Sequence, residues 1–304
     1  MPPPGTGYRA LGIALAIAGV TLFSVRPILI KIAYGYVTDP VTLLALRMVF
    51  ALPFFLAAAA WSNRKQDHAT MTRSDIAGVW GLGFIGYYFA SFADFLGLQY
   101  VSAGIGRLIM FLYPTIVVIL SAVFLRKRPA PRELAALLIT YCGVALVLSN
   151  SIAGQNANLP LGAGLVFASS AAYAVYLVIG SQVVQRLGSV RFTAYAMTVA
   201  SLFCIAQFLL LRPFSALDLP MPVYALAIAM ALFSTVLPVF MTSEALRRIG
   251  ANHVAMVGAL GPVTTIFFGY AGLDEIMTLM QVVGAALVLA GVLLVTRQPA
   301  PATR

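Results

Sequence analysis

The sequence predicts an all-α membrane protein, with ten transmembrane helices built as two inverted five-helix repeats around a central cavity. Three observations predict it: the composition, ten long apolar stretches, and a match between the two halves of the chain. Of the 304 residues, 61% are hydrophobic and only 9% are charged, whereas about a quarter of the residues in a soluble domain are charged. So few charges cannot cover a water-exposed surface, which excludes a soluble enzyme, a nucleic-acid-binding domain and a disordered chain.

Each expected helix is an apolar stretch of about 20 residues, the length that crosses the hydrocarbon core of a bilayer. Charges, prolines or glycine clusters bound ten such stretches, at residues 9–34, 40–61, 75–97, 102–125, 131–150, 160–184, 192–211, 222–244, 251–272 and 277–296. The connections are short and leave no room for a soluble domain. No charged segment or cleavage site marks the first stretch as a signal peptide, so we expect it to be retained.

The basic residues set the expected orientation, because cytoplasmic loops carry an excess of Lys and Arg. With the N-terminus inside, 14 of the 19 basic residues fall in cytoplasmic connections and tails, and only Arg212 falls on the opposite side. The net charge of +10 is therefore a signal of topology rather than of nucleic-acid binding. We expect both termini to lie in the cytoplasm.

The third observation is an internal match between residues 1–150 and residues 151–304, which we expect to be two five-helix units. The two halves align without a gap at a constant offset of 148 residues. The prolines and glycines that coincide include Pro114 with Pro262, and Gly143 with Gly291.

An odd number of helices in each copy turns the second copy upside down in the membrane. The charges agree, because a basic loop at residues 126–128 follows the fourth stretch, whereas Asp274 and Glu275 follow the ninth. Inverted repeats are typical of secondary transporters, in which two related halves open a central site to either side in turn.

Ionisable residues inside the stretches are the first candidates for substrate contacts, because charges in hydrocarbon usually face protein or a wet cavity. They lie in the outer half of the first repeat and are Arg26, Lys31, Arg47, Asp94 and Arg107. In one interpretation Arg26 or Arg107 attracts a substrate carboxylate, while Asp94 binds its ammonium group or carries a coupling proton. An Asp94–Arg107 ion pair is also expected. In the other interpretation Lys31 and Arg47 extend to the interface or bond helix-end carbonyls, and only hold helices together.

Helical spacing adds aromatic and hydroxyl candidates for the cavity wall. They are Tyr88 and Ser91 on the third stretch, Phe111 and Tyr113 on the fourth, and Tyr173 and Tyr176 on the sixth. A tyrosine ring with its hydroxyl group suits neutral or aromatic amino-acid side chains. Aromatic stripes of this kind also arise from ordinary packing or from an interfacial belt.

Prolines inside the stretches are candidate hinges. Pro27 interrupts the first stretch, where we expect a kink or break that could expose a binding site; the alternative is a simple bend. Pro114 and Pro262 occupy matching positions in the two repeats and are expected to act as paired hinges. Glu244 and His253 flank the inner ends of the eighth and ninth stretches. They could form an inner gate that senses protons, or belong to a solvated salt-bridge cluster.

Nearly the whole chain resembles the EamA branch of the drug/metabolite transporter superfamily. The matching segments are Ala251 to Pro262, Gly272 to Glu275, Gly284 and Ala290 to Leu294 in the second half, and Lys31 to Ala33, Pro40 and Leu43 to Arg47 in the first. One position departs from the family pattern: Lys127 stands where the first repeat usually has an acidic residue. Any role of that carboxylate therefore survives only at Glu275.

The resemblance implies a ten-helix carrier of the bacterial inner membrane, whose central cavity is lined by the first, third, fourth, sixth, eighth and ninth helices. It also implies export of small metabolites, with neutral and aromatic amino acids as the preferred specific expectation, by alternating access. The other open possibilities are export of other metabolites or drugs such as nucleosides and cationic compounds, a lipid-linked sugar flippase of the same superfamily, and a structural membrane protein.

Enzyme chemistry is not expected, because the motifs of zinc proteases, serine hydrolases and phosphate-binding loops are absent from the sequence. With two histidines in the chain, a metal site is not expected either. We expect no catalytic residues and no cofactor. The expected partners are a small-molecule substrate and the lipid bilayer, without nucleic acid; a monomer suffices for transport, and the oligomeric state stays open.

Overall fold

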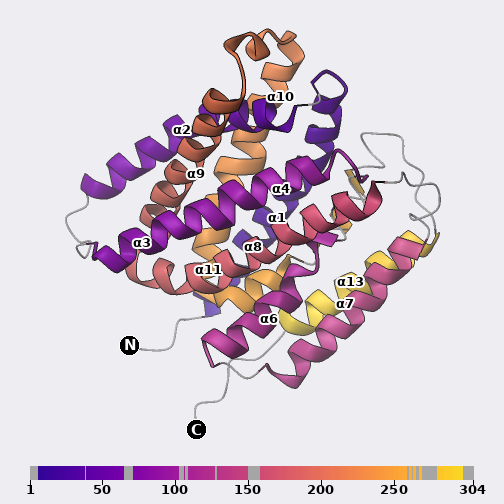
Figure 1. Cartoon of the computed structure of the whole chain (residues 1–304). Helices are drawn as coiled ribbons and strands as arrows, with labels where there is room; N and C mark the ends of the chain where they lie inside the picture. Colours follow the sequence, from indigo (N-terminus) through magenta and orange to yellow (C-terminus); the bar gives the residue numbers. More distant parts are fainter. Residues whose placement is uncertain are drawn as a thin grey trace.

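The computed structural model describes residues 6–37, 39–64, 71–102, 106, 109–126, 129–149, 158–258, 260–261, 263–264, 267–268 and 279–296. Every regular element in this part of the chain is helical (Figure 1). The α-helices are α1 (Thr6–Tyr34), α2 (Pro40–Arg64), α3 (Arg73–Leu82), α4 (Ala90–Gly97), α6 (Tyr113–Phe124), α7 (Pro131–Ser149), α8 (Leu159–Leu187), α9 (Ser189–Leu211), α10 (Met221–Ala231), α11 (Leu237–Val257) and α13 (Leu279–Thr296). The shorter elements are η1 (Gly83–Phe89), η2 (Phe214–Leu217) and η3 (Leu232–Val236).

Six helical stretches in the described part are long and apolar enough to cross a membrane. They are Gly7–Tyr34, Pro40–Arg64, Arg73–Gly97, Leu159–Leu187, Ser189–Leu211 and Met221–Val257. The described part of the chain is therefore all-helical, and the chain is a multi-pass membrane protein, as its composition predicts. Helices α7 and α13 coincide with two more of the expected stretches, and α6 covers part of another.

The helices pack in antiparallel or crossing pairs of distant segments. Helix α1 lies along α11, α2 along α9, and α4 along α8, while α7 and α13 lie side by side at one edge of the molecule (Figure 1). Glycines let the pairs approach closely: a Cβ atom on Gly97 of α4 would lie 2.7 Å from Val166 of α8. Small residues at such contacts are the usual means of helix packing in membranes.

Two spans contain a π-helical turn. The expected third stretch runs through α3, η1 and α4, and the expected eighth stretch runs through α10, η3 and α11; η1 and η3 are both π-helices. They begin at Gly83 and Leu232, which are 149 residues apart and thus almost at the offset that relates the two halves of the sequence. Such turns are rare and occur often at functional sites.

Single glycines replace two of the expected loops. Gly188 joins α8 to α9 with φ 79° and ψ 154°, and Gly250 divides α11 with φ 77° and ψ 171°. This backbone region is accessible essentially only to glycine. The helices therefore extend further than the sequence predicted, and α9 begins at Ser189 instead of residue 192.

The prolines behave differently from one another. Helix α1 continues through Pro27, so the helix does not break there, and the expected kink stays a prediction. Proline removes one backbone donor, and α1 packs along α11, η3 and α10. Pro114 stands in the first turn of α6, where a missing N–H leaves no bond unmade. Pro262 lies outside the described residues.

Candidate binding cavity

A cavity opens between α1, η1, α4, α8 and α11, near the start of α6. It holds about 660 Å³ of space that no atom fills, part of which is open to solvent. Apolar side chains such as Val20 and Phe23 form much of its wall. Its polar lining residues include Arg26, Tyr87, Ser91, Tyr113, Ser169, Tyr173 and Thr242. An apolar cavity with a few convergent polar groups is the usual form of a small-molecule site.

An ion pair stands at the wall of this cavity. Nη2 of Arg26 on α1 lies 2.8 Å from Oδ2 of Asp94 on α4, and the two side chains are only 11% and 6% exposed. Arg26 also lies over the ring of Phe23, at 5.7 Å from its centre. The structure thus shows an ion pair of Asp94 with Arg26. The expected Asp94–Arg107 pair stays a prediction, because Arg107 lies outside the described residues.

Arg47 lies deeper in the protein than the sequence predicted. It is 1% exposed, so extension of its side chain to the membrane interface is wrong: α4 and η3 cover it. Its guanidinium group lies 4.9 Å from the centre of the Phe95 ring, and its Nη1 donates to Oγ1 of Thr235 at 3.4 Å. Lys31 is half-buried.

Tyrosines from three elements form a row beside the cavity. Tyr113 contacts Tyr173 with ring centres 5.2 Å apart, and Tyr173 stacks on Tyr176 at 6.0 Å. Tyr176 in turn contacts Tyr87 at 4.6 Å. Tyr113, Tyr173 and Tyr87 line the cavity. Tyr176 is fully buried behind them and shares a hydrogen bond of 3.2 Å with Ser243, so it supports the wall.

Two predicted wall residues face elsewhere. Tyr88 packs against Phe84 and Phe203, on the side of η1 that faces α9. Phe111 is buried near Tyr141 and borders a small separate hollow that reaches α7 and α13. Neither residue lines the central cavity.

The π-turn explains why Tyr87 takes the place predicted for Tyr88. In η1 the backbone N–H of Ala90 bonds to the carbonyl of Ile85, five residues earlier. The wider turn places Tyr87, instead of Tyr88, on the same face of the helix as Ser91. Gly86 makes room on this face, since a Cβ there would lie 2.4 Å from Cβ of Tyr176. Apart from the number of glycines in this stretch, no feature of the sequence indicates a π-turn.

A second hollow lies beside the first and is more polar. It holds about 1240 Å³ of unfilled space, part of which is open to solvent, and its lining residues include Glu133, Gln182, Gln185, Asn252 and His253. Asn252 donates to Glu133 at 3.3 Å, and Nε2 of His253 lies 3.3 Å from Nη2 of Arg9. Residues 250–253 line this hollow, and Val254 and Gly258, which follow in the chain, line the central cavity. We call this second hollow the vestibule.

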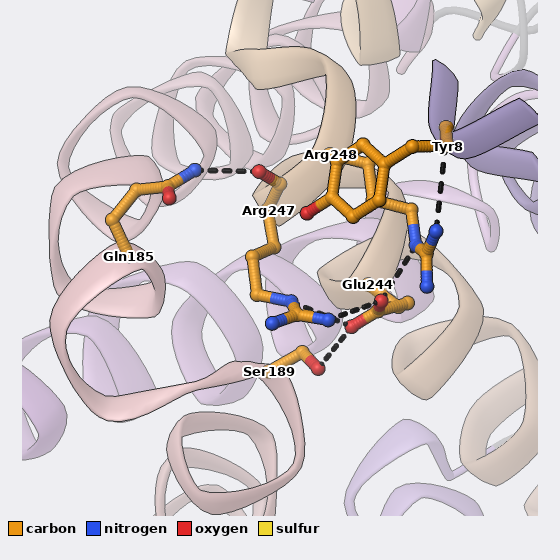
Figure 2. A network of polar contacts seen from close by, with 6 residues as sticks. All are labelled: Tyr8, Gln185, Ser189, Glu244, Arg247 and Arg248. Atoms are coloured by element: carbon orange, nitrogen blue, oxygen red, sulfur yellow. Dashed lines mark hydrogen bonds and ion pairs between the residues drawn. The ribbon is translucent and has the colours of Figure 1, made fainter. Parts of the chain in front are cut away.

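Glu244 is the centre of an ionic cluster next to the vestibule (Figure 2). Its carboxylate accepts hydrogen bonds from Arg247 at 2.7 and 3.0 Å, from Arg248 at 2.6 Å, and from the hydroxyl group of Ser189. The guanidinium group of Arg248 lies 4.4 Å from the centre of the Tyr8 ring. This Glu244 cluster therefore joins α1, α9 and α11, and its geometry is that of a salt-bridge cluster. His253 lies apart from it, in the vestibule.

A different ion pair lies at the other end of α9. Arg212 donates to both carboxylate oxygens of Asp39 at 2.9 Å, which joins the α1–α2 connection to the end of α9. Burial raises the pKa of Asp39, but hydrogen bonds from Arg212 and Thr42 lower it more, so the pKa lies below its ordinary value. The Asp39–Arg212 pair and the Glu244 cluster thus lie at opposite ends of one helix.

No group of three or more His, Cys, Asp or Glu side chains that could hold a metal ion occurs among the described residues. The charged groups at the cavity are instead Arg26 and its partner Asp94, which suit recognition of charged or zwitterionic organic solutes.

Comparison with known proteins places the chain in a family. It matches the EamA-like transporter family twice, over residues 10–149 and over residues 160–297. It is 31% identical over 285 residues to YcbK, an uncharacterized transporter of Bacillus subtilis, with 90% of this chain and 89% of that protein covered. A probable terminal-alkyne amino-acid exporter of Streptantibioticus cattleyicolor is 24% identical over 203 residues, with 66% of this chain and 67% of that protein covered.

A solved crystal structure also shares the fold, with a TM-score of 0.74 at 17% identity, and the match covers 94% of this chain and 95% of that one. The apolar helices, the cavity between them and the two family matches agree with one another. The chain belongs to the EamA-like transporter family.

Proposed function

We propose that this transporter is a secondary exporter of neutral and aromatic amino acids in a bacterial inner membrane. The observation that carries the proposal is the combination of the Arg26–Asp94 ion pair with the tyrosines at one cavity wall. An amino acid offers a carboxylate, an ammonium group and a side chain, and the wall offers a partner for each. The amino-acid exporter among the relatives supports the same substrate class.

In this proposal the substrate inserts between the two charges of the ion pair. Its carboxylate binds Arg26, its ammonium group binds Asp94, and its side chain lies against Tyr87, Tyr113 and Tyr173. Each buried charge keeps an oppositely charged partner when the substrate binds in this way. An unpaired buried charge would be strongly unfavourable. Arg107 remains a second candidate partner for the carboxylate.

We also propose the ten-helix arrangement of two inverted repeats, residues 1–150 and 151–304. The helix pairs support it. In this relation α8 corresponds to α1, and α11 corresponds to the α3–η1–α4 span. The packing of α1 along α11 then repeats the packing of α8 along α3–η1–α4. The pairs α2 with α9 and α7 with α13 then join corresponding helices of the two repeats. The matching positions of η1 and η3 support the same relation.

Alternating access follows if the two ends of the molecule open in turn. The positive-inside rule places both termini and the Glu244 cluster on the cytoplasmic side, and the Asp39–Arg212 pair on the outer side. The vestibule is then the cytoplasmic entrance, with His253 in its wall and the Glu244 cluster as an inner gate. Pro114 and Pro262 are the proposed hinges within the two repeats.

Reconstituted proteoliposomes test the proposal. Vesicles loaded with unlabelled phenylalanine should accumulate external labelled phenylalanine, tyrosine and leucine by exchange, and Arg26→Gln should abolish the exchange. Arg64→Gln, an exposed arginine at the end of α2, is the matched control and should exchange at the wild-type rate. Exchange of nucleosides or cationic drugs without exchange of any amino acid would refute the substrate assignment.

A further inference from the structure

Three ionisable side chains lie together in the protein interior beside the cavity. Arg26 and Asp94 form the ion pair at the wall, and Arg47 is close enough to interact electrostatically with both. Arginine does not give up its proton in proteins, so Arg26 and Arg47 contribute two positive charges. A carboxylate paired with arginine contributes one negative charge. The group therefore carries a net charge of +1 when the cavity is empty.

The other acidic side chains of the described part are engaged away from this group. Asp39 pairs with Arg212, Asp75 with Arg186, and Glu244 with Arg247 and Arg248, while Glu133 accepts from Asn252. Asp218 lies in the connection after η2. In the described part of the chain, Asp94 is thus the carboxylate that faces the two arginines.

The neighbours of Arg47 offset the positive charge of its guanidinium group only weakly. Its Nε and Nη2 atoms are buried and have no hydrogen-bond partner within the described residues, and its bond to Thr235 is long at 3.4 Å. The ring of Phe95 offers a cation–π contact, which compensates a buried charge only in part. A buried charge without a carboxylate of its own is unfavourable, and its field extends further than it would in water.

We infer that Arg47 determines substrate specificity, because its uncompensated charge makes the cavity select solutes that carry a carboxylate and exclude net cations. Arg47 does not line the cavity, so it acts through its field and through Arg26 in the wall. The charge of Arg47 also attracts Asp94, so Asp94 neutralises Arg26 only in part. Arg26 can therefore bind a second anionic group. The inference rests on the proposed function and narrows it: a carboxylate is required for binding to the cavity, whereas the ammonium group is required only to replace Arg26 at Asp94 during transport.

A purely structural role is the competing explanation. Arg47 joins α2 to Phe95 of α4 and to Thr235 of η3, so its removal could only loosen the packing. A change of selectivity between solutes of different charge, measured on folded protein, separates the two roles. A packing defect reduces transport of all solutes alike.

Three phenyl compounds of similar shape provide the test: N-acetylphenylalanine as an anion, phenylalanine as a zwitterion and 2-phenylethylamine as a cation. The three compounds are added as inhibitors of labelled phenylalanine exchange by the wild-type protein. The anion and the zwitterion should inhibit the exchange more strongly than the cation. Arg47→Gln should lower the preference for phenylalanine over phenylethylamine by about tenfold, whereas Arg47→Lys should keep it. An unchanged preference in folded Arg47→Gln would overturn the inference and leave the proposed function intact.

Thermal stabilisation of the purified wild-type protein by the same three compounds gives a second measurement, which does not depend on whether a variant folds or transports. We expect the two carboxylates to raise the melting temperature and phenylethylamine to leave it unchanged. Stabilisation by the amine alone would overturn the inference. Binding of both carboxylates without any amino-acid exchange would support the inference and count against the proposed function.

Discussion

Two arginine–aspartate pairs of nearly equal length lie in very different surroundings. Arg26 and Asp94 are 2.8 Å apart with side chains 11% and 6% exposed, whereas Arg212 and Asp39 are 2.9 Å apart with side chains 38% and 23% exposed. The contact chemistry is the same, so burial decides what each pair does. A buried pair is strongly destabilising to break, whereas an exposed pair contributes at most about 1 kcal/mol.

The difference separates two roles within one transporter. In our proposal, the contacts that form and break during each transport cycle are weak ones, and the Asp39–Arg212 pair and the Glu244 cluster lie where solvent reaches them. The Arg26–Asp94 pair can separate only when other charges replace both partners. In our proposal a substrate supplies those charges, so the buried pair couples substrate binding to the conformational change of the transporter. The exposed contacts offer little resistance to that conformational change.

The largest expected effect is the loss of one partner of the buried pair. Asp94→Ala leaves Arg26 unpaired and should lower the free energy of unfolding by about 3–5 kcal/mol. The double variant Arg26→Gln with Asp94→Asn removes both charges and should recover most of that loss. Thermal melting of both variants in detergent measures the difference, and equal melting temperatures for Asp94→Ala and wild type would contradict this account of the pair.

A second expected effect compares two glycines of the third span. A Cβ on Gly86 would overlap Tyr176 behind the cavity wall, whereas nothing lies within 4 Å of the position of a Cβ on Gly81. Gly86→Ala should therefore destabilise the protein by about 1–3 kcal/mol and reduce exchange. Gly81→Ala should be neutral or stabilise it slightly, because alanine favours helix more than glycine does. Similar melting temperatures for the two variants would show that the wall is not tightly packed.

The sequence alone predicted the membrane class and most of the helix positions, because hydrocarbon thickness fixes the length of an apolar stretch. It also selected Arg26 and Asp94, since charges in such stretches are rare. The sequence did not predict that these two residues form an ion pair with each other. The π-turn of η1, which exchanges Tyr87 for Tyr88, is a local departure that helical spacing does not encode. The burial of Arg47 depends on α4 and η3, which come from distant parts of the chain.

A smaller effect is expected at the Glu244 cluster, whose carboxylate is 21% exposed. Glu244→Gln weakens the contacts with Arg247, Arg248 and Ser189, and should lower the free energy of unfolding by about 1 kcal/mol. If the cluster is a gate, the same variant should change the exchange rate without changing the preference among the three phenyl compounds. A changed preference would instead place Glu244 in the substrate site, and unchanged exchange would exclude a gating role.

The smallest effect is expected at the Asp39–Arg212 pair, and it depends on pH. The pKa of Asp39 is lowered in the folded protein, because the hydrogen bonds from Arg212 and Thr42 outweigh the effect of burial. A lowered pKa contributes stability above the unfolded value of about 3.9, and the contribution is lost as the pH falls through the folded value. Wild type should therefore melt at a slightly higher temperature than Arg212→Gln at pH 7, and the two should converge as the pH falls through the lowered folded pKa of Asp39. Melting curves at a series of pH values in constant salt measure the difference, with Arg64→Gln as the control for loss of a basic side chain. A difference that stays constant down to the lowest pH would mean that Arg212 stabilises this end of α9 through packing rather than through the carboxylate.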